Sequence, residues 1–435
     1  MNGEGAPAGF RARVRMYRHG LGDCLLVTLP RHDASPYFIL IDCGVILGTA
    51  NAANVMQGVL EDVLQTTGGK VDLLVATHEH WDHLSGFIQA PEAFARLAAD
   101  AVWLAWTEDP DDELAQKLTV ERHQHLDNLR LSSARMRLAG DEQGADVVGT
   151  LLEFFGAASG GTTNDALEAV RGKRDDPRYC KPGDPPMLLD AVGARLYVLG
   201  PPRDEALIKK TLPSTKAPET YGIAAEGFAA EVVPYLAGEV ADSPFSSLYA
   251  IPNQVAQELD FLKHYWSDDA SWRGIDDAWL GAAADLAMQL DSATNNTSLV
   301  IAIELADGDV LLFAADAQVG NWLSWQDLSW TIDDRTVTGP DLLKRTILYK
   351  VGHHGSHNAT LRAKGLELMD GLRLAMIPVF HDMAVKKHWG NMPLPGLVDA
   401  LSEKVQGAVL RSDEDAPLIP GVKVTANPLY FEVEL

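Results

Sequence analysis

VDLLVATHEHWDH, residues 71–83, carries more structural information than any other stretch of this chain of 435 residues. Its first seven residues form a short, mostly apolar run, which is typical of a strand buried on both faces of a sheet. The run stops at Thr77, and three histidines and two acids follow within six residues. The sequence therefore predicts a buried strand that delivers a polar loop to one edge of a sheet.

The loop from His78 to His83 has the composition of a metal site. If it curls so that alternate side chains converge, His78 and His80 bind one cation while Asp82 and His83 face another. Zn²⁺ accepts imidazole nitrogen and carboxylate oxygen alike, at about 2.0–2.2 Å. A solvated polar loop is the alternative, but so dense a set of ligands directly after a buried strand is rare without a metal. The spacing predicts a centre for two metal ions.

Apolar and β-branched runs recur along the chain and predict a core of strands. Three runs near the N-terminus, residues 11–18, 23–29 and 37–44, are expected to form consecutive antiparallel strands. Residues 299–316 should form a hairpin around Asp307-Gly308. Further strands are expected at 101–106, 188–199, 346–352, 374–380, 421–426 and 429–435, and helices at 51–65, 359–369 and 394–404. This α+β pattern is compatible with two sheets covered by helices on their outer faces.

Two stretches depart from the strand pattern. Residues 110–178 are mostly helical in pattern, and residues 201–291 are mostly helical with irregular loops that contain proline. We interpret both as insertions on one domain that spans residues 1–435. A small cap over the core is the alternative.

The charge of the chain limits its partners. Sixty-one acidic residues against 36 basic ones give a formal charge of −25, and no basic run offsets it locally, so binding to long nucleic acid is disfavoured. A small phosphorylated substrate stays open, because a metal centre supplies its own positive charge. Three cysteines cannot form a disulfide framework, and neither a leader nor a membrane-spanning run is found, so a cytoplasmic protein is expected. A protein partner or a homo-oligomer remains open.

The motifs resemble the metallo-β-lactamase superfamily, whose HxHxDH signature is present as His78–His83. Other segments look like the metallo-β-lactamase-like domain of bacterial DNA-uptake (competence) channel proteins and follow its order. They are HGLGDC (19–24), IDCG (41–44), KPGD (181–184), NNTSLV (295–300), FAAD (313–316) and HHGS (353–356). HxHxDH and HHGS are specific signals, whereas the short Gly-Asp pieces are weak alone. Together the motifs span most of the chain and leave the two insertions unmatched.

The resemblance implies a fold and a ligand set. The fold is a four-layer αβ/βα sandwich with the ligands on loops at one edge. Asp316 corresponds to the carboxylate that bridges two metals, and His354 to the final metal ligand, beside His78, His80, Asp82 and His83. Asp82 would also orient the attacking water, and His353 would act as a catalytic group that contacts the substrate. The implied cofactors are two divalent metal ions, with zinc favoured over manganese or iron.

Two positions leave alternatives open. Most superfamily members supply a further histidine ligand just after the strand that here ends near Trp106, but this chain has Glu108 and Asp109 there. Either acid could replace that histidine or cap the following helix, and two histidines, His123 and His125, lie further along. Asp42 is expected to support the ligand loop from behind or to be a plain turn residue.

These features together favour a metal-dependent hydrolase that uses a metal-activated hydroxide. The resemblance favours a phosphodiesterase or nuclease-like reaction, and the charge favours a nucleotide or a small phosphodiester as substrate. An acyl hydrolase, such as a lactonase, thioesterase or β-lactamase-like enzyme, would use the same centre. A non-catalytic metal-binding partner protein is the alternative from a different class.

Overall fold

The structure, a computed structural model, describes residues 9–139, 161–214, 218–221, 293–387 and 392–435, with single positions at 145, 148, 149, 152 and 259. The chain divides into two compact units. The first consists of Met1–Thr119, Phe154–Ala224 and Ser292–Leu435, and the second of Val120–Glu153 and Ala225–Asp291. Both sheets and the ligand-rich loop belong to the first unit, which is the subject of the following paragraphs.

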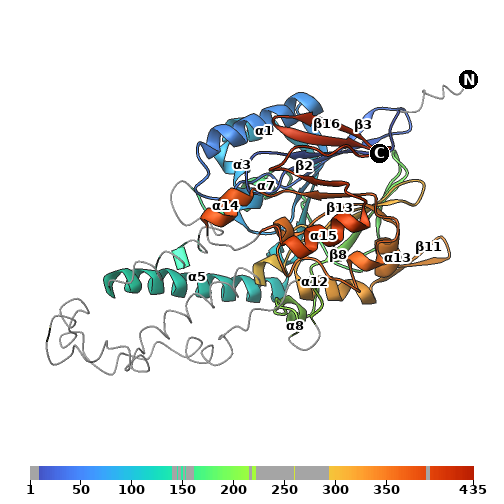
Figure 1. The fold of residues 1–435 in the computed structure, drawn as a ribbon. Helices are drawn as coiled ribbons and strands as arrows, with labels where there is room; N and C mark the ends of the chain where they lie inside the picture. The colour runs from blue at the N-terminus through green and yellow to red at the C-terminus, as the bar shows by residue number, and fades with distance from the viewer. Residues whose placement is uncertain are drawn as a thin grey trace, which may run out of the picture. The chain divides into compact units, whose positions relative to one another are not determined.

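One sheet collects the N-terminal strands and the two ends of the chain (Figure 1). Strands β1 to β3 pair antiparallel, as expected, and β17 pairs antiparallel with both β16 and β1. Beyond β3, the strands β4, β5 and β6 continue the sheet in parallel. In spatial order the sheet contains β16 (Lys423–Asn427), β17 (Tyr430–Glu434), β1 (Arg13–Tyr17), β2 (Leu25–Pro30), β3 (Pro36–Ile41), β4 (Lys70–Ala76), β5 (Ala98–Ala105) and β6 (Arg178–Cys180).

The second sheet is built from the middle and later strands. Strands β9 and β10 form the predicted antiparallel hairpin, whereas β13 runs parallel to β10, and β14 and β15 extend that parallel half. Its spatial order is β15 (Val409–Arg411), β14 (Leu374–Ile377), β13 (Thr346–Lys350), β10 (Val310–Phe313), β9 (Val300–Glu304), β8 (Ala194–Gly200) and β7 (Met187–Leu189). A separate ribbon pairs β11 (Ser329–Ile332) with β12 (Arg335–Thr338). An α+β chain with mixed sheets is therefore confirmed.

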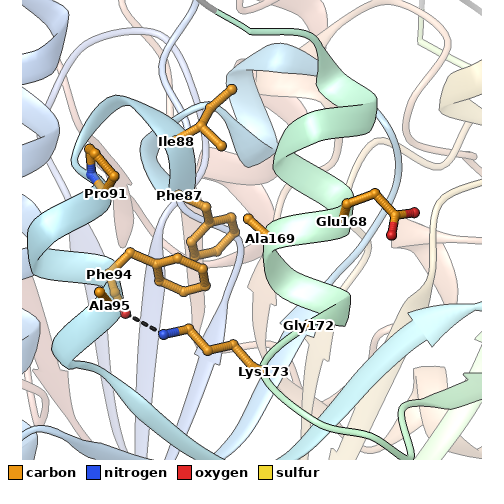
Figure 2. A pocket seen from close by; sticks show the side chains of 9 residues that line it. All are labelled: Phe87, Ile88, Pro91, Phe94, Ala95, Glu168, Ala169, Gly172 and Lys173. Atoms are coloured by element: carbon orange, nitrogen blue, oxygen red, sulfur yellow. Dashed lines mark hydrogen bonds between the residues drawn. The ribbon is translucent and has the colours of Figure 1, made fainter.

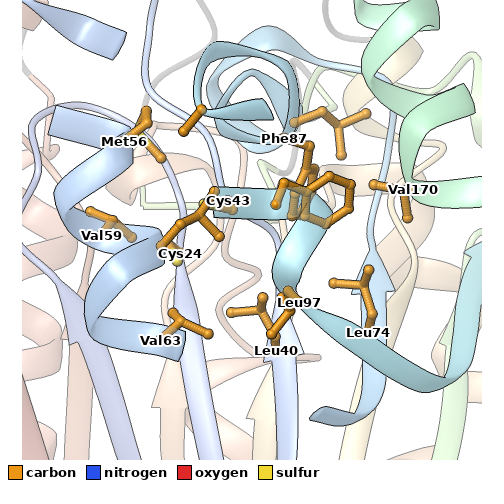
Figure 3. Packing of buried hydrophobic residues seen from close by; sticks show 14 of the residues in the cluster. Cys24, Leu40, Cys43, Met56, Val59, Val63, Leu74, Phe87, Leu97 and Val170 are labelled. Atoms are coloured by element: carbon orange, nitrogen blue, oxygen red, sulfur yellow. The ribbon is translucent and has the colours of Figure 1, made fainter. Parts of the chain in front are cut away.

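Helices on one face of the first sheet close a continuous apolar core (Figure 3). In α1 (Ala52–Thr67) the buried residues Met56, Val59, Leu60, Val63 and Leu64 recur at helical spacing, so one stripe of the helix packs on the sheet. Burying each such side chain contributes roughly 1.5–3 kcal/mol. The same core includes residues of α3 (Gly86–Gln89), α4 (Pro91–Arg96) and α7 (Thr163–Arg171).

Short helices and a tryptophan cluster accompany the second sheet. The rings of Trp322 and Trp325 stack with centroids 4.0 Å apart, and Trp322 packs edge-on against Tyr349 of β13. Both tryptophans are buried, as is Trp330, so all three are core residues. The remaining elements of this part are α8 (Glu205–Ile208), α12 (Val319–Ser324), η7 (Trp325–Asp327), α13 (Gly339–Lys344), η9 (Leu366–Leu368), α14 (His381–Lys386) and α15 (Pro395–Lys404).

The prediction of a helix at residues 359–369 is wrong. That segment consists of turns and the single turn of η9, and Leu361 forms an isolated β-bridge with Thr220. The carbonyl oxygen of Ala359 accepts a hydrogen bond from the indole N–H of Trp322, so it is not available to a helix. Tertiary contacts thus outweigh the helical spacing of the apolar residues.

The two predicted insertions stay predictions. The first range contains α5 (Glu113–Ala139), which begins in the first unit and continues into the second, and α7. Most of the second range, 201–291, lies outside the described residues. Among the described residues, no helix combines the length and the apolar character needed to cross a membrane.

Candidate metal centre

The predicted ligands come from the ends of three strands. The loop 78–83 follows β4 and leads into α2 (Trp81–Leu84). Asp316 follows β10, and His353 and His354 follow β13 in η8 (His353–Gly355). Strands β10 and β13 are parallel, so their carboxyl ends lie at the same edge of the second sheet. The N–H of Leu299, just before β9, donates to the carbonyl of Thr77 at 2.8 Å and joins the two sheets at this edge.

Four of the predicted ligands converge. Nε2 of His83 lies 3.2 Å from Oδ2 of Asp316, and Nε2 of His354 lies 3.0 Å from Oδ2 of Asp82. One ligand atom of each of these four residues lies within 4.8 Å of the others, and all four side chains are buried. The sequence places these residues up to 272 positions apart, and the fold brings them into one cluster.

His78 and His80 lie next to this cluster but outside the group of four, and the ring centroids of His78 and His83 are 4.3 Å apart. Nε2 of His78 and Nδ1 of His80 are 3.0 Å apart, and both rings are buried. Burial lowers the pKa of His78 well below its usual value and the pKa of His80 to about 3, with the nearby imidazoles acting in the same direction. Both rings are therefore neutral, which is the state in which an imidazole binds a metal.

The two histidines of the cluster, His83 and His354, have raised pKa values. Burial acts to lower the pKa of His83, but Asp316, Asp23 and Asp42 outweigh it and raise that pKa well above the usual value. The pKa of His354 is raised in the same way, against burial, by its hydrogen bond to Asp82 and by other nearby carboxylates. The nearby carboxylates thus favour the protonated form of both rings, and a cation that binds here competes with protons.

One buried polar atom of the cluster fits a metal better than it fits the surrounding protein. Oδ1 of Asp82 makes no hydrogen bond within the described part of the chain. Nε2 of His83 makes none of acceptable geometry either, but it lies 3.2 Å from Oδ2 of Asp316 in an ion pair. A buried polar group without a partner is costly, and a divalent cation would satisfy the Asp82 oxygen. The buried His and Asp side chains can therefore hold a metal ion.

Asp42 contacts the ligand loop, as the first of the two hypotheses for this residue predicts. Its side chain is fully buried, and Oδ2 lies 2.8 Å from Nδ1 of His83. Thr77 donates from its N–H to Oδ1 at 2.8 Å and from its hydroxyl to Oδ2 at 2.7 Å. A carboxylate on the far nitrogen of an imidazole fixes the ring and its tautomer, as is usual for metal-binding histidines.

The loops behind the centre pack backbone against backbone. A Cβ on Gly44 would lie 2.5 Å from the carbonyl carbon of Asp82 and from the backbone of His83. Gly22, with a φ of +152°, would place a Cβ 2.3 Å from the carbonyl oxygen of Gly44. Only glycine leaves this space, so both positions are fixed by the approach of the ligand loop.

His353 lies beside the ligands with a small exposed fraction of 8%. Nδ1 of its ring lies 3.4 Å from the side-chain nitrogen of Gln318. The backbone N–H of His353 donates to Oδ1 of Asp316 at 3.1 Å. Burial lowers the pKa of His353 to about 4, so the ring is neutral. A neutral, slightly exposed imidazole can donate a hydrogen bond to a bound oxygen atom.

Glu108 and Asp109 stand where most members of the resembling superfamily supply a further histidine ligand. Glu108 lies in η1 (Trp106–Glu108), and Asp109 accepts a hydrogen bond from the N–H of Asp111 at 3.0 Å, as a turn residue does. Neither acid belongs to the two groups of clustered ligand atoms found among the described residues. His123 and His125 lie on the part of α5 that belongs to the second unit.

Sequence reasoning missed three side chains near the centre. Asp23 and Lys350 form a buried ion pair behind the ligands, and Gln318 contacts His353. Asp23 stands in a quoted motif, but nothing in the sequence paired it with a lysine 327 residues later. Asn296 donates from its side-chain amide to the carbonyl oxygens of Ile208 and Lys210, and its Oδ1 accepts from the N–H of Gln318.

A pocket of about 400 Å³ lies elsewhere in the first unit, between α3, α4 and α7 (Figure 2). Its lining is mostly apolar, with Phe87, Ile88 and Phe94 among the residues. The ammonium of Lys173 donates to the carbonyl oxygens of Phe94 and Leu97. The pocket thus presents no reactive set of groups, in contrast to the histidine and aspartate cluster.

Comparison with known proteins gave no family model, no curated protein and no solved structure that matches this chain. The candidate centre is therefore defined by the geometry of the chain's own residues.

Proposed function

We propose that this chain is a metal-dependent hydrolase of the metallo-β-lactamase type. The observation that carries the proposal is the buried convergence of Asp82, His83, Asp316 and His354 beside the His78–His80 pair. The two mixed sheets with helices packed on them are compatible with the four-layer αβ/βα sandwich of that superfamily. The candidate ligands follow the ends of β4, β10 and β13, which supports the proposal because the resemblance implies ligands on loops at one edge.

In this proposal the residues hold two divalent metal ions, with zinc favoured. His78 and His80 would bind the first ion, and Asp82, His83 and His354 the second, with Asp316 between them. When bound, such a pair acidifies a water molecule and stabilises negative charge that develops on the substrate. His353 would donate a hydrogen bond to the substrate oxygen on which that charge develops. Asp82 would orient the attacking water, and Asp42 would hold the ring of His83 in place.

The proposed substrate is a phosphodiester or nucleotide-type molecule of small size. The order of the motifs favours a phosphate ester, and two metals suit in-line displacement at phosphorus. The formal charge of −25 makes association with a long polyanion unfavourable. A small ester with one negative charge meets far less of this repulsion, because it interacts mainly with the local charge of the centre.

The test combines metal content with hydrolysis. The purified protein, prepared without chelator, is analysed for bound metal and assayed with bis(p-nitrophenyl) phosphate in the presence of Zn²⁺ or Mn²⁺. The Asp82→Ala variant removes one ligand, and Asp399→Ala, an exposed acid on α15, is the matched control. We expect metal-dependent turnover that is lost in Asp82→Ala and kept in Asp399→Ala.

Three other results separate the alternatives. Bound metal without turnover of the phosphodiester, but with turnover of a lactone, a thioester or a β-lactam, assigns the centre to acyl transfer. Bound metal with no turnover of either class contradicts the hydrolase proposal and favours a non-catalytic metal-binding protein. Less than one equivalent of metal contradicts the proposed centre itself.

A further inference from the structure

Lys350 is a charged side chain in the interior of the first unit. It is the last residue of β13, three positions before His353, and its exposed fraction is 1%. Lysine is almost never fully buried unless its charge is paired, because removing an ammonium from water costs several kcal/mol. A buried lysine next to a cluster of ligand-type residues therefore requires an explanation in terms of charge.

The ammonium meets three oxygen atoms. Its Nζ forms an ion pair with Asp23, donates to the carbonyl of Ala315 at 3.1 Å, and lies 3.8 Å from Oδ1 of Asp316. Burial acts to lower the pKa of Lys350, but Asp23 and Asp316 outweigh it and raise that pKa, so the side chain is charged. An ammonium has three N–H donors, and this one lies among oxygens from three different residues.

Asp23 connects this ammonium to the metal ligands. Its carboxylate oxygens lie 3.9 Å from Nδ1 of His83 and 3.8 Å from Nδ1 of His354. Asp23, Asp42 and His83 also form a second group whose ligand atoms lie within 4.8 Å of one another. A cation is expected beside two such carboxylates, and the ammonium of Lys350 already lies against one of them.

The contact with Ala315 fixes the direction of Asp316. Ala315 has a φ of +47°, a left-handed conformation that is unfavourable for a non-glycine residue. Its carbonyl accepts from both Lys350 Nζ and the N–H of His353, each at 3.1 Å. These two donors hold the strained turn that presents the next residue, Asp316, to His83.

We propose that Lys350 is a positioning residue of the metal centre. Its ammonium acts as a fixed internal cation that neutralises Asp23 and holds Asp316 with Oδ2 towards His83 and the metals. This inference rests on the proposed metal centre and assigns to it a residue that binds no metal. Removing the ammonium thus affects the metal affinity through the direction of Asp316, and affects the stability through the unpaired Asp23.

The two effects can be separated by a pair of variants. Lys350→Met leaves Asp23 buried and unpaired, so the metal-free protein should unfold at a clearly lower urea concentration. Lys350→Met combined with Asp23→Asn removes both charges, and its stability should recover. The zinc affinity of the double variant, measured by competition with a chelating dye, should stay about 10–100-fold below that of the wild type, the usual effect of losing an outer support.

Lys344→Met, at an exposed lysine on α13, is the matched control and should change neither property. A double variant that is stable and binds zinc with wild-type affinity overturns the inference, because Lys350 would then only neutralise Asp23. A wild-type protein that binds no zinc contradicts the proposed centre, which is a different result from a wild type that binds zinc beside an unaffected variant.

Discussion

Replacing Asp42 by asparagine changes the hydrogen-bonding character of one buried side chain without changing its shape. The remaining oxygen can still accept from the N–H of Thr77, so the amide nitrogen takes the place of Oδ2, 2.8 Å from Nδ1 of His83. A metal binds the neutral ring, whose single proton lies on Nδ1 when Nε2 is the ligand atom. An amide nitrogen donates, which forces Nδ1 of the neutral ring to accept and leaves its proton on Nε2. Nε2 is the atom that faces Asp316, and when protonated it has no lone pair for a cation.

The expected magnitude follows from this change of tautomer. Loss of a support of this kind typically lowers metal affinity about 10–100-fold, which corresponds to roughly 1.4–2.8 kcal/mol. The measurement is zinc affinity at neutral pH by competition with a chelating dye, on wild type and Asp42→Asn. Thermal unfolding of both metal-free proteins, recorded in parallel, shows whether the variant is folded.

Thr77→Val and Asp399→Asn serve as controls. Thr77→Val removes a hydroxyl that donates to the Asp42 carboxylate and lies 3.1 Å from Nδ1 of His78, but it keeps the contact of Asp42 with His83. A smaller loss of zinc affinity than in Asp42→Asn is therefore expected. Asp399 is exposed, and its replacement should have no effect. If Asp42→Asn binds zinc as tightly as the wild type, the tautomer argument is refuted, and Asp42 is only a turn residue.

Gly44→Ala should abolish zinc binding or prevent folding, because its Cβ would overlap the backbone of the ligand loop. Its control, Gly58→Ala, lies at an open position in α1 and should raise the unfolding free energy by about 0.5–1 kcal/mol. Trp322→Ala should cost about 3–5 kcal/mol in urea unfolding, while Trp322→Phe keeps most of the packing and loses mainly the bond to Ala359, about 1 kcal/mol; equal losses would contradict a packing role. Zinc binding should release protons from His83 and His354, whose pKa values are raised, so the affinity should rise with pH until the pH exceeds those pKa values. Calorimetry in buffers of different ionisation enthalpy measures that release, and a buffer-independent heat would contradict it.

The sequence could predict the local part of this centre and not its surroundings. The loop 78–83 lies within one short window directly after a buried strand, so its composition alone indicates a metal site. Hairpins such as β1–β2 and β9–β10 are equally local, and their turn residues announce them. The parallel pairing of β10 with β13 and the return of β17 to β1 join distant segments and have no local signature.

The surroundings of the centre depend on those distant pairings. Lys350 is one polar residue in the apolar strand TILYK, and only the neighbouring β10 and the loop with Asp23 give its charge a partner. The segment 359–369 shows the converse error, because its apolar spacing fits a helix while its backbone is already bonded to Trp322. In both cases the decisive contacts come from residues that a window of sequence does not contain.

The proposed metal centre would let an acidic protein attract an anionic substrate. The cluster holds the carboxylates of Asp23, Asp42, Asp82 and Asp316 beside the ammonium of Lys350 and the rings of His83 and His354. Two divalent cations bound among these groups would add four positive charges, and displaced ring protons would offset only part of that gain. Screening by salt is weak in a buried cluster. Under this proposal a phosphodiester with a single negative charge is attracted more strongly by the metal-loaded centre than by the empty one, so the metal would serve in binding as well as in reaction.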